Sequence, residues 1–346
     1  MKRAGLAVGV LGLGITLGPA LADERVVHLA AVGDVAFRRQ VGKDIAAGTS
    51  NPFSAVEKSL RADLLFANLE TVLSVRKLPE PKTSRRFPII SSPPQAAKLL
   101  SQVGFDVVSV ANNHAFDYFA PGFTDTLSHL DAAHIVAIGG GRTAKDAAAP
   151  FVRTVNGVRV GMLAFASGVN RAAHGNAFVS RRYSPAALQA VRALRSQVDV
   201  LLVSVHFGIE GYAQPIPKQT QFAHAVIEAG ADVVIGHHPH VLQSIEWYRG
   251  RPIFYSLGNF LFGKQPKVRR QTAILHLELG TGQSPLRAAS LEPILIREET
   301  ERPDIPSEAE AQEIFSRLRR ASRGFNVHLE EKQGRLEVRP QAAEGR

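Results

Sequence analysis

The stretch Ala231-Asp-Val-Val-Ile-Gly-His-His-Pro-His240 places three imidazoles directly after an apolar run. A short apolar run of this kind predicts a buried β-strand, so the histidines would stand where that strand ends. Imidazole is the commonest side-chain metal ligand, and the proline is expected to hold the backbone extended so that the rings beside it face one point. Taken alone, the stretch also fits a polar loop with surface histidines.

Other predicted strands end in the same way. Apolar runs at 26–32, 63–67, 106–110, 198–205 and 231–235 are followed by Asp34, by Glu70, by Asn113 with His114, by His206, and by His238 with His240. Ligands bind at strand ends in α/β sheets, so these side chains together favour a functional site. Singly, each also fits a plainer role: a turn or helix cap, the partner of a loop arginine, or a buried core histidine.

The order of elements predicts an α/β fold. Helices are expected at 51–62, 92–103, 121–133, 185–197 and 216–229, alternating with the strands, and strand hairpins follow from 241 to 296. This pattern favours two sheets packed face to face with helices outside. Between Ser74 and Pro88 lies a proline-rich, basic stretch containing Arg85 and Arg86. We read it either as a solvated loop or as a basic rim whose two arginines bind an anionic substrate.

The N-terminus resembles a secretory signal peptide at residues 1–22. Lys2 and Arg3 precede an apolar run from Ala4 to Leu17, and small residues follow before Asp23. Export to the periplasm or the cell exterior is therefore expected, with a retained N-terminal anchor as the alternative. No membrane span is expected after cleavage. The chain has no cysteine, so any metal must be held by His, Asp, Glu or Asn.

The chain of 346 residues carries a formal charge of +10, and loss of the two cationic residues at the N-terminus would leave +8. A basic exported protein suits an anionic partner, such as an anionic polymer or a phosphorylated small molecule. No nucleic-acid-binding motif is present, so nucleic acid is not expected as a partner. We expect one domain at 23–300 and a charged helix and strand extension at 301–346.

Six segments carry a resemblance to a known family. They are Gly33-Asp34, Asn68-Leu-Glu-Thr71, Ala111-Asn-Asn-His-Ala-Phe-Asp-Tyr118, His206-Phe-Gly-Ile-Glu210, Gly236-His-His-Pro-His240 and Tyr255-Ser-Leu-Gly-Asn-Phe260. From residue 26 to residue 296 the chain resembles the CapA-type capsule-biosynthesis family, which is associated with poly-gamma-glutamate and belongs to the calcineurin-like metallophosphoesterase superfamily. The resemblance implies a four-layer α/β/β/α sandwich with a site for two divalent metals at the strand ends.

The resemblance also implies a role for each site residue. The implied ligands are Asp34 and His240 for one metal, Asn113, His206 and His238 for the other, and Glu70 as the bridging carboxylate. His114 would face the substrate as general acid, with Asp117 as its orienting partner. Asn259 would contact the substrate near the rim of the site, or would merely close a turn between two strands.

Two positions depart from the superfamily pattern. Ala36 stands where a histidine is usual, and Glu70 replaces the usual aspartate. The first metal would thus lose a ligand, so either one or two ions are expected. The mixed nitrogen and oxygen ligands suit manganese, iron or zinc, and the missing histidine shifts the expectation towards manganese or magnesium, with manganese first.

Three functions fit these observations. The first is an exported metal-dependent hydrolase of a phosphoester or related anionic bond, linked to capsule or cell-envelope polymer metabolism. The second is a non-catalytic accessory protein that binds an anionic polymer such as poly-gamma-glutamate, within an envelope biosynthesis complex. The third is a structural module with a degenerate site, which ranks last because the residues implied as ligands and as general acid are present.

Overall fold

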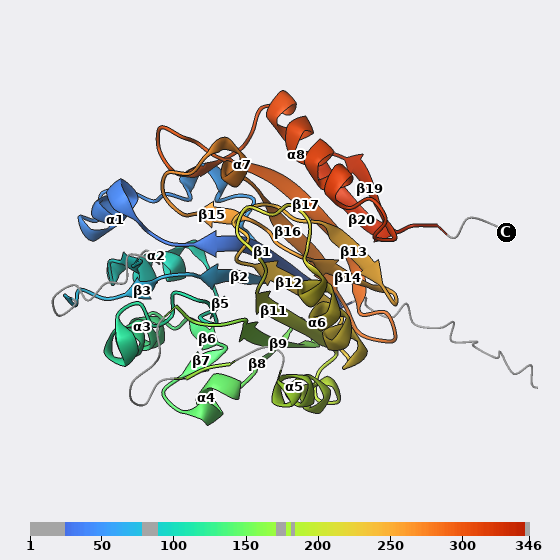
Figure 1. The fold of residues 1–346 in the computed structure, drawn as a ribbon, viewed down its shortest axis with the longest axis horizontal. Coiled ribbons are helices and arrows are strands. Elements are labelled where there is room, and N and C mark those ends of the chain that lie inside the picture. The colour runs from blue at the N-terminus through green and yellow to red at the C-terminus, as the bar shows by residue number, and fades with distance from the viewer. Residues whose placement is uncertain (1–24, 78–88, 171–177, 181–183, 343–346) are drawn as a thin grey trace, which may run out of the picture.

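The computed structural model describes residues 25–77, 89–170, 178–180 and 184–342. These residues form two β-sheets packed face to face, with helices on both outer sides (Figure 1). The predicted signal peptide at 1–22 and the candidate substrate-binding residues Arg85 and Arg86 lie outside the described residues. Within the described part of the chain, no helix is both long and apolar enough to span a bilayer.

The larger sheet has ten strands. Its central strand is β1 (Val27–Val35), which pairs in parallel with β2 (Leu64–Leu69) on one side and antiparallel with β16 (Gln271–Leu279) on the other. Beyond β2 the sheet continues in parallel through β5 (Val107–Ser109) and β6 (Val136–Ile138). Beyond β16 it continues antiparallel through β17 (Leu286–Ile296), β20 (Arg335–Pro340) and β19 (Val327–Lys332). Two short strands join its edges, β15 (Asn259–Leu261) beside β1 and β18 (Pro303–Asp304) beside β17.

The smaller sheet has six strands. Four parallel strands form its centre: β9 (Val158–Ala166), β11 (Val200–His206), β12 (Val233–His237) and β14 (Arg251–Phe254). Antiparallel strands β8 (Phe151–Val155) and β13 (Ile245–Tyr248) flank them. The β8–β9 hairpin turns at Asn156 and Gly157, both with positive φ, as the sequence predicts for this pair of residues. Two further pairs of short strands are β3 (Val72–Leu73) with β4 (Ser91–Ser92), and β7 (Gly140–Gly141) with β10 (Phe178–Val179).

Three apolar cores divide the molecule into layers. The central core lies between the sheets and joins side chains such as Phe66 of β2 and Leu202 of β11. A second core packs the outer face of the larger sheet against α1 (Arg39–Ala46), α2 (Gln95–Val103) and α3 (Phe119–Ala132). A third packs the smaller sheet against α5 (Pro185–Arg195) and α6 (Pro217–Glu228). The predicted four-layer α/β/β/α sandwich is confirmed. Short helices α4 (Ala144–Ala148) and α7 (Lys267–Arg270) lie outside these layers' cores.

The segment after residue 300 continues the sandwich. Strand β20 pairs with β17, so the C-terminal strand pair extends the larger sheet. Helix α8 (Glu308–Ala321) begins at a capping box between Ser307 and Glu310, and its Phe315 and Leu318 enter the core between the sheets. The charged face of this helix stays outside.

One predicted helix is wrong. Residues 51–62 form only the 3-10 turn Ser54–Val56, because the side chain of Asn51 accepts a hydrogen bond from the backbone of Phe53 at 2.9 Å and competes with helical bonding. Phe53 packs instead against Phe37 and Phe260. Helix α1, by contrast, was not predicted, since only Val41 and Ile45 mark its buried face.

Candidate metal centre

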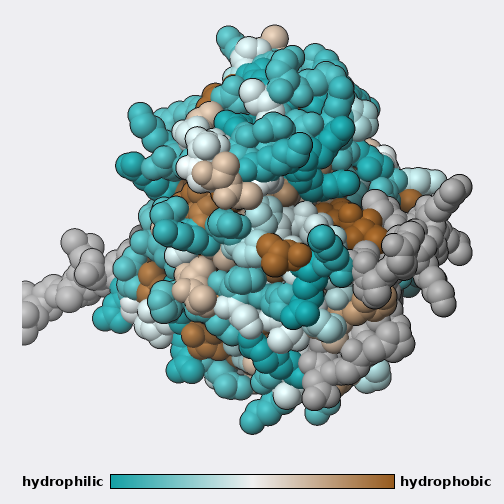
Figure 2. Space-filling model, turned by 90° about the vertical axis from the view of Figure 1, so that its left-hand side faces the viewer, coloured by the Kyte–Doolittle hydropathy of each residue, from teal (hydrophilic) through white to brown (hydrophobic). Residues whose placement is uncertain are grey.

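The polar ends of strands from both sheets meet at one edge of the sandwich. Strand β1 ends beyond Asp34, β2 ends just before Glu70, and β11 and β12 end in His206 and His237. The arrows of β1, β2 and β9 in Figure 1 point towards this side, which faces the viewer in Figure 2. Figure 2 shows a mostly hydrophilic face with hydrophobic patches around its middle. The sequence prediction that these residues cluster is consistent with the distances that follow.

Two glycines allow the strand ends to approach so closely. A Cβ on Gly33 would lie 2.0 Å from the carbonyl oxygen of Gly258, and one on Gly236 would lie 2.0 Å from that of Tyr255. Both distances are far below van der Waals contact, so no other residue fits without moving the backbone. Gly33 directly precedes the predicted ligand Asp34, and Gly236 lies two residues before the predicted ligand His238. The sequence therefore places ligands where the chains touch backbone to backbone.

Asp34 joins the two sheets. Its Oδ1 accepts a hydrogen bond from Nδ2 of Asn68 at 2.8 Å, and its Oδ2 lies 3.2 Å from Nδ1 of His240. The backbone N–H of His238 donates to Oδ2 at 3.3 Å, and Nδ1 of His237 lies 3.4 Å from Oδ1. Complete burial would raise the pKa of Asp34, but His237 and His240 outweigh it and hold the pKa well below its usual value. The carboxylate is therefore ionised.

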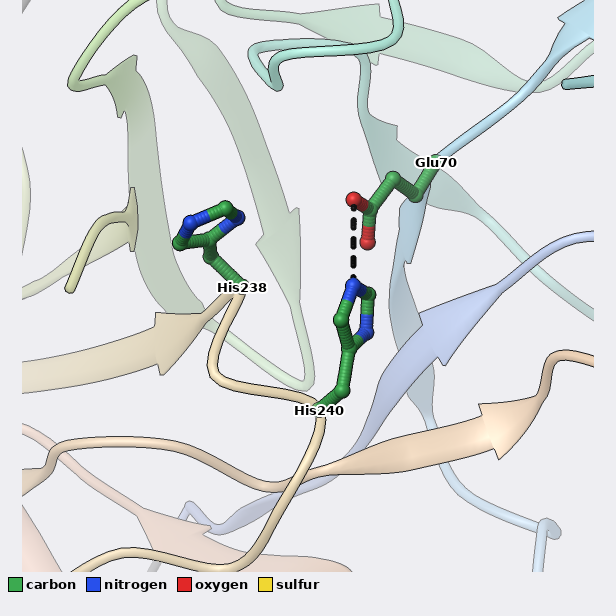
Figure 3. A group of neighbouring side chains, drawn as sticks. All are labelled: Glu70, His238 and His240. Carbon is green, nitrogen blue, oxygen red and sulfur yellow. Dashed lines mark ion pairs between the residues drawn. The ribbon is translucent and has the colours of Figure 1, made fainter. Parts of the chain in front are cut away.

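Glu70 lies at the centre of a ring of imidazoles. Its Oε1 is 3.5 Å from Nε2 of His206, 3.8 Å from Nε2 of His240 and 4.0 Å from Nε2 of His114. Both carboxylate oxygens are buried, and neither has a hydrogen-bond partner among the described residues. Burial, followed by the charge of Asp34, raises the pKa of Glu70 well above its usual value. Figure 3 shows Glu70 and His240 pointing towards each other, with His238 beside them.

The predicted ligands Asn113, His206 and His238 form the other flank. Nε2 of His206 and Oδ1 of Asn113 lie 2.8 Å apart, and the rings of His206 and His238 have centroids 4.7 Å apart. Burial and the neighbouring His238 lower the pKa of His206 well below its usual value. Burial and His240 lower the pKa of His238 to about 4. Both rings are thus neutral at physiological pH, the state in which imidazole binds metals.

The histidine loop is turned rather than extended. His238 and His240 have φ values of +98° and +56°, in the left-handed region that side chains with a Cβ seldom adopt. The expectation of an extended backbone around Pro239 was therefore wrong. The turn follows from the contacts at both ends, where the backbone of His238 donates to Asp34 and the carbonyl of Pro239 accepts from Gly211 at 2.8 Å. Such strain is typical of functional sites.

His114 is held by one carboxylate. Its Nδ1 lies 2.6 Å from Oδ2 of Asp117, and the same oxygen accepts the backbone N–H of Ile90 at 2.7 Å. The backbone N–H of His114 donates to Oδ1 of Asn112 at 3.2 Å. Nε2 of His114 is consequently the free nitrogen, and it faces Glu70. The structure thus brings His114 and Asp117 together as the resemblance implies, while their role in catalysis stays a prediction.

Asn259 lies behind His240. Its Oδ1 is 2.8 Å from Nδ1 of His240, and its Nδ2 donates to the backbone carbonyls of Arg269 and His240 at 3.1 and 3.4 Å. The side chain is fully buried with its polar atoms occupied, so the geometry gives Asn259 the task of orienting His240. Ala36 is also fully buried, in a small apolar cluster with Ile90 and Phe262. The ring of Phe262 lies 4.5 Å from that of His240.

Sequence reasoning missed three residues of the site. Asn68 bridges the flanks, since its Nδ2 lies 2.8 Å from Asp34 and 3.2 Å from Nδ1 of His206. Asn112 donates to the carbonyl of Leu69 at 2.9 Å and fixes the segment before Glu70. Arg38, half-buried, places its guanidinium 5.7 Å from the centroid of Phe262. Both asparagines stand at strand ends, where asparagine is also common in ordinary turns, so the sequence alone did not indicate their role in the site.

The residues present fit a metal ion. Two groups of side chains could each hold an ion, because the ligand atoms within each group lie within 4.8 Å of one another. The groups are Glu70 with His238 and His240, and Asp34 with Glu70 and His206. A fully buried carboxylate without a donor, beside an unpartnered Nδ1 of His238, is unfavourable unless a cation balances it. The chain also supplies only nitrogen and oxygen donors here, which suit divalent ions. These buried groups can hold a metal, and both include Glu70.

Comparison with known proteins shows the family of the chain. Residues 28–264 match the family described as Bacterial capsule synthesis protein PGA_cap. The chain belongs to this family. The PGA_cap match covers every residue that lines the centre, from Asp34 to Asn259.

Two curated relatives of the chain are named as PGA or capsule biosynthesis proteins. It is 32% identical over 275 residues to the PGA biosynthesis protein CapA of Bacillus subtilis, a match that covers 75% of this chain and 70% of the relative. It is 30% identical over 271 residues to the capsule biosynthesis protein CapA of Bacillus anthracis, covering 74% of this chain and 65% of the relative. Among solved structures, a 5'-nucleotidase of Candida albicans matches 88% of this chain and 60% of its own, with a TM-score of 0.43 and 11% identity.

Proposed function

We propose that this protein is an exported, metal-dependent hydrolase that cleaves a phosphoester or related anionic bond in capsule or cell-envelope polymer metabolism. The observation that supports the chemistry is the arrangement around Glu70, whose unpartnered carboxylate lies within 4.0 Å of three imidazoles at the meeting point of both sheets. The polymer context comes from the PGA and capsule biosynthesis proteins to which the chain is similar.

The metal and the protein would have separate roles in the reaction. Asp34, Glu70, Asn113, His206, His238 and His240 would hold one or two divalent ions, with manganese proposed first and iron, zinc or magnesium as alternatives. When bound, such an ion polarises the scissile oxygen and neutralises developing charge. Asn68 holds the proposed ligands Asp34 and His206 in position, and Asn259 holds His240.

His114 would supply the proton to the leaving group. Its Nδ1 is engaged by Asp117, so only Nε2 can exchange a proton with a substrate that lies over Glu70. The carboxylate of Asp117 fixes the direction of the ring. Acid catalysis by one positioned imidazole accounts for about 10² to 10⁴ in rate.

Arg38 would bind the anionic part of the substrate. It follows β1, four residues after Asp34, and its guanidinium lies over the Phe262 ring that also packs against His240. No carboxylate within the described residues forms an ion pair with it, whereas the adjacent Arg39 lies 3.8 Å from Glu301. A guanidinium stacked on a ring that itself contacts a predicted ligand suits a phosphate or carboxylate oxygen.

The test is metal analysis of protein purified without chelator, together with an assay on aryl phosphomonoesters and phosphodiesters in added manganese. We expect bound metal and manganese-dependent turnover that is lost on His114→Ala while the metal remains. Bound metal without turnover on either ester would overturn the hydrolase proposal. A mature N-terminus that still begins at Met1 in the native host would overturn the export proposal.

A polymer-binding accessory protein is the second candidate. It is favoured by the names of the curated relatives and by the excess of 41 basic over 31 acidic residues. In this role the same centre would bind carboxylates of an anionic polymer without cleaving it, within an envelope biosynthesis complex. Metal-dependent binding of the polymer together with absence of turnover would decide for this second function.

A further inference from the structure

A groove between α7 and α8 lies outside the metal centre. The two helices run close together at the top of Figure 1, and a cavity of about 940 Å³ opens between them. Its walls carry the small or apolar side chains Ala213, Val268, Ala309 and Ala321, and Val268 is 46% exposed. A cavity of this size accommodates several units of a linear ligand.

The groove has an uncompensated positive charge. It contains three basic side chains, Lys267, Arg317 and Arg320, and one acidic side chain, Glu313. Lys267 pairs with Glu313 at 2.8 Å. Within the described residues, no ion pair with a carboxylate is formed by Arg317 or by Arg320, and Arg317 bonds to neutral acceptors. Two cations therefore face the cavity without a balancing anion.

The contacts of Arg317 indicate what the groove binds. Its Nη1 donates to the backbone carbonyl of Val268 at 2.9 Å and to Oε1 of Gln271 at 3.3 Å, both neutral acceptors. Burial, together with the charge of Arg320, lowers the pKa of Arg317. Arg317 is half-buried and Arg320 is exposed, and both line the same groove, so an anion bound there would offset their mutual repulsion. The arrangement is typical of a site that binds carboxylates or phosphates.

The groove is linked to the metal centre through two segments. Asn259, whose Oδ1 contacts His240, also donates to the carbonyl of Arg269 in α7. Gln214, which lines the groove, belongs to the loop that follows His206, and its carbonyl accepts from Gln243 at 3.2 Å. Helix α7 thus contacts a side chain that orients His240, and one wall of the groove comes from the loop that follows His206.

We propose that the groove between α7 and α8 binds a segment of a carboxylate-bearing linear polymer, with Arg317 and Arg320 pairing with its carboxylates and the apolar walls contacting its aliphatic backbone. The inference deepens the proposed function, since the neighbouring metal centre would act on or hold the same polymer. The apolar walls favour a polymer that alternates carboxylates with methylene groups over one that is uniformly charged.

The test measures binding of a fluorescent oligomer of γ-linked glutamate by anisotropy at low salt. We expect Arg320→Gln to raise the dissociation constant about threefold to tenfold, and Arg320→Glu to raise it further. Arg317→Lys keeps the charge but loses the planar fork and should also weaken binding. The matched control is the double variant Arg159→Gln and Arg192→Gln, which removes two exposed charges from β9 and α5 and should leave binding unchanged.

Two further measurements separate this site from the metal centre. An oligomer whose carboxylates are esterified should not bind, and His240→Ala should retain binding of the free acid in the groove. Absence of binding to the wild-type protein, equal binding by Arg320→Glu, or equal binding of the ester would overturn the proposal. Binding that is lost on His240→Ala and unchanged in both arginine variants would also overturn it, while leaving the metal-centre proposal intact. Retained binding by a protein without turnover would instead refute the hydrolase function alone.

Discussion

Oδ2 of Asp117 holds both Nδ1 of His114, at 2.6 Å, and the backbone N–H of Ile90, at 2.7 Å. One carboxylate oxygen thereby orients the imidazole that faces Glu70 and anchors the chain before β4. The arrangement leaves a single imidazole nitrogen available at the site, and it makes the catalytic proposal testable at two positions.

We expect His114→Ala to lower kcat by about 10² to 10⁴ with unchanged metal content, because the side chain donates a proton rather than binding the ion. Asp117→Asn should lower kcat by about tenfold to a hundredfold, since it only orients the ring. The measurements are steady-state kinetics and metal analysis of both variants. Loss of metal on His114→Ala would show that His114 is a ligand.

Glu70→Gln tests the unpartnered carboxylate. Manganese at a hundredfold excess over its dissociation constant should raise the free energy of unfolding of the wild-type protein by about 2.7 kcal/mol. Manganese should raise the free energy of unfolding of the Glu70→Gln variant much less, because the amide removes the charge that both ligand groups share. Glu228→Gln, a change at an exposed carboxylate paired with Arg249, is the control. Equal manganese stabilisation of wild type and Glu70→Gln would remove Glu70 from the ligand set.

Arg38→Gln tests binding of the anionic substrate. We expect KM to rise about tenfold with little change in kcat, since a lost charged hydrogen bond affects ground state and transition state alike. Arg39→Gln is the matched control, because Arg39 is exposed and lies beside Glu301. Kinetics on an aryl phosphomonoester provide the comparison. A KM that rises equally in both variants would indicate general electrostatic attraction instead of a specific contact.

Gly33→Ala should displace the backbone next to the predicted ligand Asp34. Its Cβ would lie 2.0 Å from the carbonyl oxygen of Gly258, so we expect at least about 1 to 3 kcal/mol of destabilisation and weaker metal binding. Gly168→Ala meets nothing within 4 Å and should change stability by less than about 0.5 kcal/mol. Denaturant unfolding of both variants decides the matter, and equal stability of the two would contradict the close approach.

Glu292 gives the protein an acid-sensitive contact far from the centre. Burial would raise its pKa, but hydrogen bonds with His276 and Ser59 and the charge of Arg335 outweigh burial and lower the pKa to about 2. Because the folded pKa lies below the unfolded value, the stabilisation is complete above about pH 4.5 and is lost as pH falls towards 2. After allowance for solvent screening, about 1 to 2 kcal/mol is involved. Glu292→Gln should flatten this part of the stability curve, and an unchanged curve would contradict the assignment.

The sequence predicted the parts of the structure that depend on pattern. Apolar runs predicted the strands of both sheets. The polar residues that follow these runs, from Asp34 to His240, are the ones that lie together in the structure. The turn at His238 and His240 escaped prediction, because its positive φ values arise from contacts with Asp34 and Gly211, which are distant in the chain. The role of Asn68 escaped for the same reason, since only the folded chain shows that it joins Asp34 to His206.

The contacts of Asp34 also determine when the centre can form. The carboxylate meets the backbone of His238 across 204 positions of sequence, and His240 in turn needs Asn259. Contacts between such distant residues form late, because closing long loops is entropically costly before the sheets have assembled. A nascent or unfolded chain thus lacks the assembled ligand set, and a metal could be bound only in the compartment in which the second sheet is completed.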